Sequence, residues 1–372
     1  MAINEIENLK HLAYKLSTTH CIINGEIWEL DKIEQLGCNK FSLQSKLTLP
    51  LKLYKYFPNI CNVENINYSI ESLKNNTVYL QTPNNFDDVY DSDIHMDYSE
   101  YERYRLIEYC ERSNIQIDEN LSTHEIGDLF VQSLLKIYLE TKDFSNIFTK
   151  DNLTEIEKLS NKLFVHKIIK QLEKSDDLTK AVQAAIQSGF EEYSFQLKNT
   201  FRVSCFTTDP YSQLMWAGYA NCHKGFCVEY TILPNDKKYE NIYINLFPMI
   251  YCKTRPNMTK QLSSFEDKDI TEDIVWNIYF HGALRKSLDW AYQNEWRLLM
   301  PRGNKVDDYN KEFFPITKVF LGNKMDFKTR KEIIEICNSK NIPYIGVTRK
   351  LDTFEMEECK IKCEDCYKFK VG

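Results

Sequence analysis

The 372-residue chain has no glycine between residues 128 and 188, and strand-like segments lie on both sides of this stretch. From about residue 100 to about residue 200 the apolar residues recur with a helical period, and Ser122-Thr-His-Glu125 has the form of a capping box. A block of helices between two groups of strands favours an α+β fold over an alternating doubly wound one. We therefore predict an α+β domain with a mixed or antiparallel sheet core and a helical insertion.

We expect the segments patterned as strands before and after the insertion to meet in one sheet system. They are residues 51–57, 77–83, 201–208, 226–233, 247–253, 295–301, 316–322 and 342–349. Helices are predicted at 66–76, 212–220, 271–289 and 327–339, and within the insertion from about Thr154 and from about Leu178. The strand, helix and strand between residues 316 and 349 predict a crossover connection within the sheet.

These patterns divide the chain into three parts. The principal domain is placed at residues 49–350, with the insertion at about 100–200. Residues 1–48 are predicted to be an N-terminal extension, in which Asn24-Gly25 forms a tight turn. Residues 351–372 form a C-terminal tail that carries Cys359, Cys363 and Cys366. Three cysteines supply at most three ligands, whereas structural zinc sites use four, so we expect no metal there.

Charge and hydropathy limit the partners. The chain has 47 Lys and Arg against 54 Asp and Glu, a formal net charge of -7, which does not favour non-specific binding of nucleic acid. No window approaches eighteen uninterrupted apolar residues, and acidic residues occur at the start without an apolar segment. We expect a cytoplasmic protein that binds a small molecule or a protein and no membrane. The pattern carries no signal for oligomeric state.

Polar residues gather in a loop and on three of the predicted strands. The loop contains Asn84, Asn85, Asp87, Asp88 and Asp91, whose oxygens are typical either of a hard-cation site or of turns and helix caps. The strand candidates are Lys55 and Tyr56 on the first strand, Arg202 and Ser204 on a middle strand, and Gln293, Glu295 and Arg297 on a late strand.

The late strand is the most informative of these. Gln293, Glu295 and Arg297 alternate, so they are expected to point to one side, opposite Trp296. Unpaired charge in a core is costly. Either Glu295 belongs to a buried ion pair, or this face lines a pocket and Glu295 faces the strand that bears Ser204. Trp216 and Tyr219 share one helix face, which is typical of core packing.

Five ordered segments resemble the bacterial family known as domain of unknown function 2971. They are LYKYF from residue 53, VYLQTPNNFDDVYDS from 78, VSCFTT from 203, LMWAGYANCHKGFCVEY from 214 and WAYQNEWRLL from 290. The family typically has Asn-Asp-Pro in its loop and Glu-x-Glu on its late strand. The chain departs from both, with Asp87-Asp88-Val89 and Gln293-x-Glu295.

The order of key residues is also similar to that of ADP-ribosyltransferases, which use NAD as substrate. This resemblance implies that Glu295, with Gln293, holds the nicotinamide ribose and stabilises positive charge as the glycosidic bond breaks. It implies that Ser204 supports the ribose site and that Lys55 or Tyr56 helps to hold the dinucleotide; Arg202 and Arg297 are further candidates for contacts with NAD. Here Lys55 and Tyr56 stand where those enzymes usually have Arg or His.

Three hypotheses about function remain open. The first is an ADP-ribosyltransferase-like or NAD-cleaving enzyme acting in bacterial defence or as a toxin. The second is a non-catalytic module that recognises a small ligand or a protein. The third is a metal-dependent nuclease or phosphoesterase that uses Asp87, Asp88, Asp91 and Glu295. Carboxylates converging within metal-binding distance would favour the third, whereas a pocket with Glu295 as its acidic residue would favour the first.

Overall fold

The computed structural model divides the chain into two compact units. Unit 1 comprises Met1–Asp93, Gln196–Arg255 and Asp273–Gly372, and unit 2 comprises Ile94–Phe195 and Pro256–Glu272. The predicted boundaries at residues 48 and 350 do not coincide with a boundary between the units. The structure describes residues 18–112, 114–118, 120–130, 133, 191, 194–195, 197–255, 257–259, 279–302 and 308–360.

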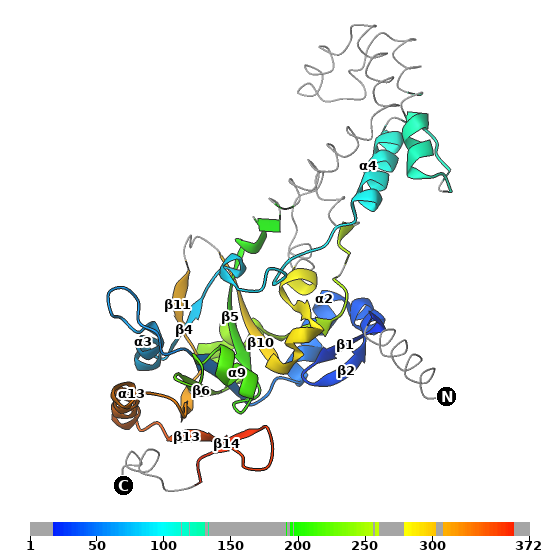
Figure 1. Cartoon of the computed structure of the whole chain (residues 1–372). Helices are drawn as coiled ribbons and strands as arrows, with labels where there is room; N and C mark the ends of the chain where they lie inside the picture. The colour runs from blue at the N-terminus through cyan, green and yellow to red at the C-terminus, as the bar shows by residue number, and fades with distance from the viewer. Residues whose placement is uncertain are drawn as a thin grey trace, which may run out of the picture. The chain divides into compact units, whose positions relative to one another are not determined.

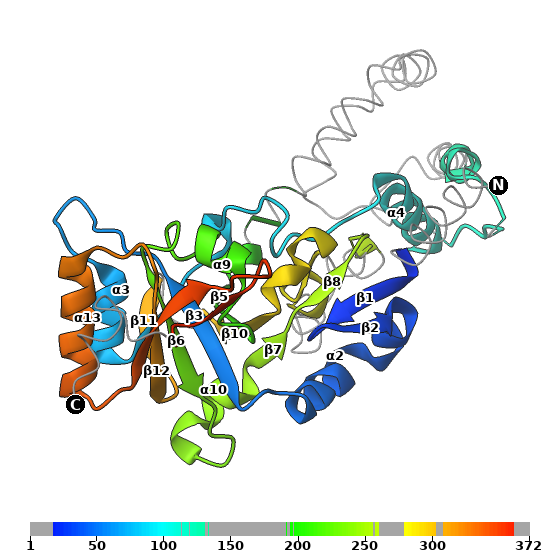
Figure 2. The same cartoon turned by 60° about the horizontal axis from the view of Figure 1, so that its bottom comes forward.

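An eight-stranded sheet forms the centre of unit 1 (Figures 1 and 2). Its order is β14 (Met356–Glu358), β13 (Tyr344–Arg349), β12 (Ile316–Leu321), β6 (Phe226–Thr231), β3 (Lys52–Phe57), β5 (Phe201–Thr207), β10 (Glu295–Pro301) and β7 (Leu246–Pro248). β3 precedes the insertion, and it pairs antiparallel with β6 and β5, which follow it. Strands before and after the insertion therefore meet in one sheet, as predicted, but residues 77–80 and 250–252 pair in two smaller sheets instead. Because β12 and β13 are parallel, the sheet is mixed and the α+β prediction is also confirmed.

A second sheet contains residues that we assigned to the N-terminal extension. Its order is β2 (Glu26–Glu29), β1 (His20–Ile23), β8 (Ile250–Cys252) and β9 (Arg285–Ser287). Asn24 and Gly25 join β1 to β2 with positive φ angles of 52° and 79°, as expected for a tight turn. The chain continues into α2 (Leu30–Leu47). β4 (Thr77–Leu80) and β11 (Tyr309–Glu312) pair as a separate ribbon.

The helices follow the sequence prediction with two corrections. α3 (Tyr68–Asn75), α9 (Gln213–Gly218) and α13 (Phe327–Ser339) are close to their expected ranges, and α4 (Tyr98–Arg112) falls in the stretch predicted to be helical. The sequence did not predict α2 or α10 (Glu240–Ile244). The predicted helix at 271–289 is wrong over its described end. There, η3 (Tyr279–Ala283) leads into β9, because pairing with β8 outweighs the local helical pattern, and η4 (Leu288–Gln293) follows. The predicted strand at 247–253 is divided at Met249 into β7 and β8.

The described part of unit 2 confirms the predicted capping box. The backbone N–H of Glu125 donates to Ser122 Oγ over 3.3 Å, and the backbone N–H of Ser122 donates to Glu125 Oε2 over 2.7 Å. Residues 123–130 are helical after this box. The helices expected from Thr154 and Leu178 lie outside the described residues.

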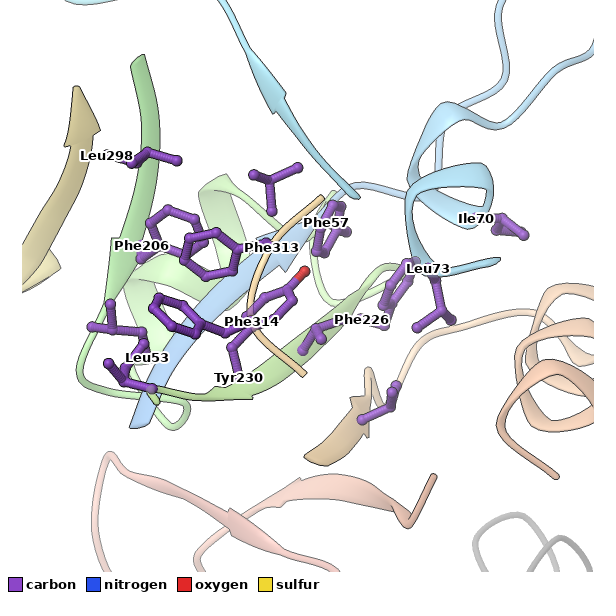
Figure 3. Packing of buried hydrophobic residues seen from close by; sticks show 14 of the residues in the cluster. Leu53, Phe57, Ile70, Leu73, Phe206, Phe226, Tyr230, Leu298, Phe313 and Phe314 are labelled. Carbon is purple, nitrogen blue, oxygen red and sulfur yellow. The ribbon is translucent and has the colours of Figure 1, made fainter. Parts of the chain in front are cut away.

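The main apolar core of unit 1 lies on one face of the large sheet. α3 and α13 lie side by side (Figures 1 and 2), and their apolar residues belong to the same cluster as those of this face. Figure 3 shows the rings of Phe206 and Phe313 face to face, with centroids 4.3 Å apart and an interplanar angle of 11°. Trp296, Leu298 and Phe206 point to this face, so the alternate residues Glu295, Arg297 and Cys205 point to the other.

Candidate functional site

A group of buried charges lies on the second face of the large sheet, around Arg297 of β10. Arg297 is 0% exposed. Its Nε donates to Glu295 Oε1 over 2.6 Å, and its two terminal nitrogens donate to the carboxylate of Asp91 over 2.8 and 2.5 Å. Glu295 is two residues away on the same strand face, whereas Asp91 comes from the loop after β4. The planar guanidinium therefore joins the carboxylates of Asp91 and Glu295, which are far apart in the sequence.

Lys286 of β9 is the second cation of the group. Its Nζ lies 3.2 Å from Glu295 Oε2 and 3.3 Å from Asp91 Oδ2, and it donates to Gln293 Oε1 over 3.0 Å. The same ammonium stands 5.0 Å from the ring centroid of Trp290. We call Asp91, Lys286, Gln293, Glu295 and Arg297 the charge cluster. Its two carboxylates are balanced by two cations, which is the condition under which buried charges are tolerated.

The cations keep both carboxylates ionised. Burial raises the pKa of Glu295, but the attraction of Arg297 and Lys286 outweighs burial and lowers it to about 2. Burial also raises the pKa of Asp91, but the positive charges of Arg297 and Lys286 outweigh burial and lower this pKa below its ordinary value. The pKa of Lys286 is raised, because Glu295 and Asp91 outweigh its burial. At neutral pH Glu295 is therefore an anion and is not a proton donor.

Gln293 connects the charge cluster to the surface. It is the last residue of η4, and Asn294, with a positive φ of 42°, turns the chain from η4 into β10. Gln293 Nε2 donates to the hydroxyl of Tyr219 over 2.6 Å. Tyr219 follows α9 and is 40% exposed, although we expected it to pack in the core. The polar contacts thus run from the fully buried Arg297 to a tyrosine in contact with solvent.

Lys55 of β3 occupies the place where β3 and β5 diverge. These strands pair only at Tyr54 and Thr207. Lys55 Nζ donates to Ser204 Oγ over 3.1 Å and to the carbonyl of Cys205 over 3.0 Å, next to the ring of Phe206 at 5.2 Å. Burial lowers the pKa of Lys55, and the negative charge of Glu295 acts in the opposite direction. Among the described residues, no carboxylate forms an ion pair with this ammonium.

The predicted site residues therefore fall into two groups. Gln293, Glu295 and Arg297 are in the charge cluster, whereas Lys55 and Ser204 contact each other on the opposite face of the sheet. Ser204 points to the opposite sheet face from Glu295, because it stands opposite Leu298 in the β5–β10 register. Glu295 does face β5, but its partner there is Thr207. Of the two alternatives for Glu295, the structure shows the buried ion pair, and a cavity lined by Trp28 and Phe41 does not include this residue.

Tyr56 and Arg202 have separate partners. The Tyr56 hydroxyl donates to the carbonyl of Asp209 over 3.0 Å, and its ring packs on Trp216 at 5.2 Å. Arg202 Nε lies 2.8 Å from Asp308 Oδ1. Tyr56 lies on the α9 side of β3, and Arg202 points to the opposite sheet face from Arg297.

Two members of the charge cluster were not recognised as such in the sequence. Lys286 lay in a segment that we expected to be helical, and Asp91 was grouped with Asp87 and Asp88 as a candidate cation ligand. The structure instead directs Asp91 toward Arg297. Among the described residues, no three His, Cys, Asp or Glu side chains converge as a metal site would require.

Part of the chain that carries the charge cluster is similar to a known family. Residues 215–298 match the family model described as "Protein of unknown function (DUF2971)". This segment includes Tyr219, Lys286, Gln293, Glu295 and Arg297, so the resemblance noted in the sequence is confirmed here. No curated protein and no solved structure matches the chain significantly. In the described ranges, no helix has the length and apolar character needed to span a bilayer.

Proposed function

We propose that this chain is an ADP-ribosyltransferase-like or NAD-cleaving enzyme whose reacting centre is the Glu295 side of the charge cluster. One observation supports this most strongly: Glu295 and Gln293, the pair that the resemblance assigns to the nicotinamide ribose, both contact Lys286 in the charge cluster. Lys55 and Ser204 lie on the neighbouring strands β3 and β5, but on the opposite face of the sheet. We further propose that the protein acts in the cytoplasm, where NAD is present, in bacterial defence or as a toxin.

The role proposed for Glu295 is electrostatic. Breaking the bond between nicotinamide and ribose develops positive charge on the ribose, as in glycoside hydrolysis. A carboxylate held ionised next to that charge lowers the barrier without transferring a proton. The low pKa of Glu295, about 2, suits this role and does not suit a general acid.

Access to Glu295 involves Lys286. Arg297 holds Glu295 Oε1 and Lys286 holds Oε2, so a ligand reaches the carboxylate by replacing the Lys286 contact. The nicotinamide ring of NAD is itself a cation, and it can take the position of the ammonium beside Glu295 and over Trp290. Gln293 then becomes available to bind a ribose hydroxyl. Lys55 and Ser204 lie on the opposite face of the sheet, so in this proposal they stabilise the strands behind the site and do not contact NAD.

The experiment is incubation of the purified full-length protein with NAD, with release of nicotinamide followed by chromatography. The proposal predicts release that depends on the protein and a rate about 10²–10³-fold lower in Glu295→Gln. Glu295→Gln keeps the size of the side chain and removes its charge. Binding of NAD is measured in parallel by calorimetry, since removal of a transition-state interaction lowers the rate more than the affinity. The proposal is wrong if the wild-type protein does not bind NAD and does not release nicotinamide from it.

A second candidate is a non-catalytic recognition module. The observation in its favour is that Glu295 is only 4% exposed and both its oxygens already contact cations. On this hypothesis the charge cluster fixes the surface around Tyr219, where a small ligand or a protein binds. Binding of NAD without release of nicotinamide would favour this candidate. No observation favours a metal-dependent nuclease, because Asp91 and Glu295 both bind Arg297 and Lys286.

A further inference from the structure

Two cysteines lie directly opposite each other in the second sheet. Cys21 of β1 and Cys252 of β8 are partners in the antiparallel register of these strands. Residues that face each other in this way have Cα atoms about 4.5–5.5 Å apart, and their side chains lie on the same face of the sheet. A disulfide joins residues whose Cα atoms are about 4.4–6.8 Å apart. The backbone therefore already holds the two residues at the separation that a disulfide needs.

Both cysteines are free thiols in one apolar cluster. Cys21 is 1% exposed and Cys252 is 4% exposed. Burial raises the pKa of both thiols, and it raises that of Cys21 to about 11 together with the neighbouring Cys252. Because a protonated thiol is a poor nucleophile, the pair stays reduced at neutral pH until an oxidant is supplied.

A buried cation acts on both thiols. Arg285 of β9 is 4% exposed, and its Nη1 lies 3.2 Å from Glu34 Oε1. The positive charge of Arg285 opposes the effect of burial on the pKa of Cys21 and of Cys252, and Glu34 acts in the other direction. For Cys252 a hydrogen bond with Arg285 adds to this effect. A guanidinium next to a thiol stabilises the thiolate, so Cys252 is the better nucleophile of the two.

The pair lies at the end of a short ladder. β1 and β8 pair over two residues each, and Cys252 is the last residue of β8. Residues 253–255, which follow it, are exposed. The end of such a ladder opens locally at a lower free energy than the whole domain unfolds. A small oxidant therefore reaches Cys252 from the side of residues 253–255.

We propose that Cys21 and Cys252 form a disulfide when the protein meets a peroxide, and that this bond fastens the β1–β2 hairpin to β8. The thiolate of Cys252 attacks one oxygen of hydrogen peroxide, the O–O bond breaks, and a sulfenic acid and water form with the proton of the thiol. The thiol of Cys21 then attacks the sulfenic sulfur, the S–O bond breaks, and a second water leaves as the S–S bond forms. Two thiols and one hydrogen peroxide thus give one disulfide and two waters.

The disulfide adjoins strands that contact the charge cluster. Tyr251 precedes Cys252 in β8, and its hydroxyl accepts from the backbone N–H of Glu295 over 2.8 Å. β8 also pairs with β9, which carries Lys286. The proposal does not rest on the reaction with NAD, because the disulfide is measured directly and uses no residue of the charge cluster.

The test is treatment of the reduced full-length protein with hydrogen peroxide. Remaining thiols are then blocked with N-ethylmaleimide in denaturant, and the digested protein is analysed by mass spectrometry. We expect a peptide pair that joins Cys21 to Cys252 and is released by dithiothreitol, whereas Cys227, which stands opposite Tyr56 and Phe320, is recovered with its thiol blocked. The oxidised protein should unfold at a higher temperature than the reduced one, because the bond closes a long loop.

Two variants test the chemistry. Cys21→Ser should remove the joined peptides and the rise in unfolding temperature, and it should leave Cys252 as a sulfenic acid that dimedone labels. The matched control is Cys222→Ser, which removes an exposed thiol and should change neither result. The joined peptides are measured in the wild-type protein, so the decision does not depend on whether a variant folds. Peroxide that leaves Cys21 and Cys252 unjoined, that joins them equally to other cysteines, or that leaves the unfolding temperature unchanged would overturn the proposal.

Discussion

Two carboxylates in one row of the large sheet have very different surroundings. The strand registers place Glu229, Tyr54, Thr207 and Glu295 opposite one another across β6, β3, β5 and β10, so all four point to the same face. Glu229 accepts from Lys52, whose side chain is 53% exposed, and from the hydroxyls of Tyr54 and Thr317. Both carboxylate oxygens of Glu295 contact buried cations, Arg297 and Lys286.

The difference shows what burial requires of an acidic residue. Glu229 is 5% exposed, almost as buried as Glu295, but its donors are two neutral hydroxyls and one exposed lysine. Removing the charge of Glu229 therefore leaves no buried cation without a partner. At Glu295 the charges are mutually dependent, and loss of one partner leaves another charge buried without compensation. We therefore expect substitutions around Glu295 to lower the free energy of unfolding more than substitutions around Glu229.

The largest effect is expected for Arg297→Met. This change leaves Asp91 and Glu295 next to each other with Lys286 as their only cation. We expect a loss of about 3–5 kcal/mol in the free energy of unfolding, measured by urea denaturation at pH 7. A loss below about 1 kcal/mol would show that solvent reaches the cluster and that the buried pairing is not needed.

The next effect is that of removing one carboxylate. Glu295→Gln and Asp91→Asn each remove one negative charge from the same four-charge group and keep the side-chain size. Each should cost about 2–3 kcal/mol in unfolding free energy, since a hydrogen bond with a charged group is lost. If one variant has no effect while the other has the full effect, the two carboxylates are not parts of one balanced group.

Lowering the pH should reduce the difference in unfolding free energy between the wild-type protein and Glu295→Gln. The pKa of Glu295 is lowered on folding from about 4.5 to about 2, so the folded state favours the ionised form. This contribution is fully present above pH 4.5 and is lost as the pH falls toward 2. Urea denaturation of both proteins between pH 7 and pH 2 measures it, and a difference that stays constant would contradict the lowered pKa.

The smallest effect is expected at Glu229. In Glu229→Gln the hydroxyls of Tyr54 and Thr317 still have an acceptor, and Lys52 remains solvated. The expected loss is about 1 kcal/mol. Lys52→Met serves as the control for the exposed partner and should cost about 0.2–1 kcal/mol. A loss at Glu229 equal to that at Glu295 would remove the contrast between the two positions.

The sequence predicted local patterns better than distant partners. Alternation along residues 295–301 correctly separated Glu295 and Arg297 from Trp296, because the period of a strand is a local property. Gln293 was expected on the same strand, but it ends η4 and reaches the charge cluster from there. Lys286 and Asp91 could not be assigned, because their partners depend on how β9 and the loop after β4 fold onto β10, and no spacing encodes that arrangement.

The central claim is that Glu295 acts on NAD and does not serve only to balance charge. The most direct measurement is the rate of nicotinamide release by wild type, Glu295→Gln and Asp91→Asn at a temperature where all three are folded. Our account predicts a rate about 10²–10³-fold lower for Glu295→Gln, with Asp91→Asn within about tenfold of wild type. Equal losses in the two variants, or no loss in Glu295→Gln, would contradict it.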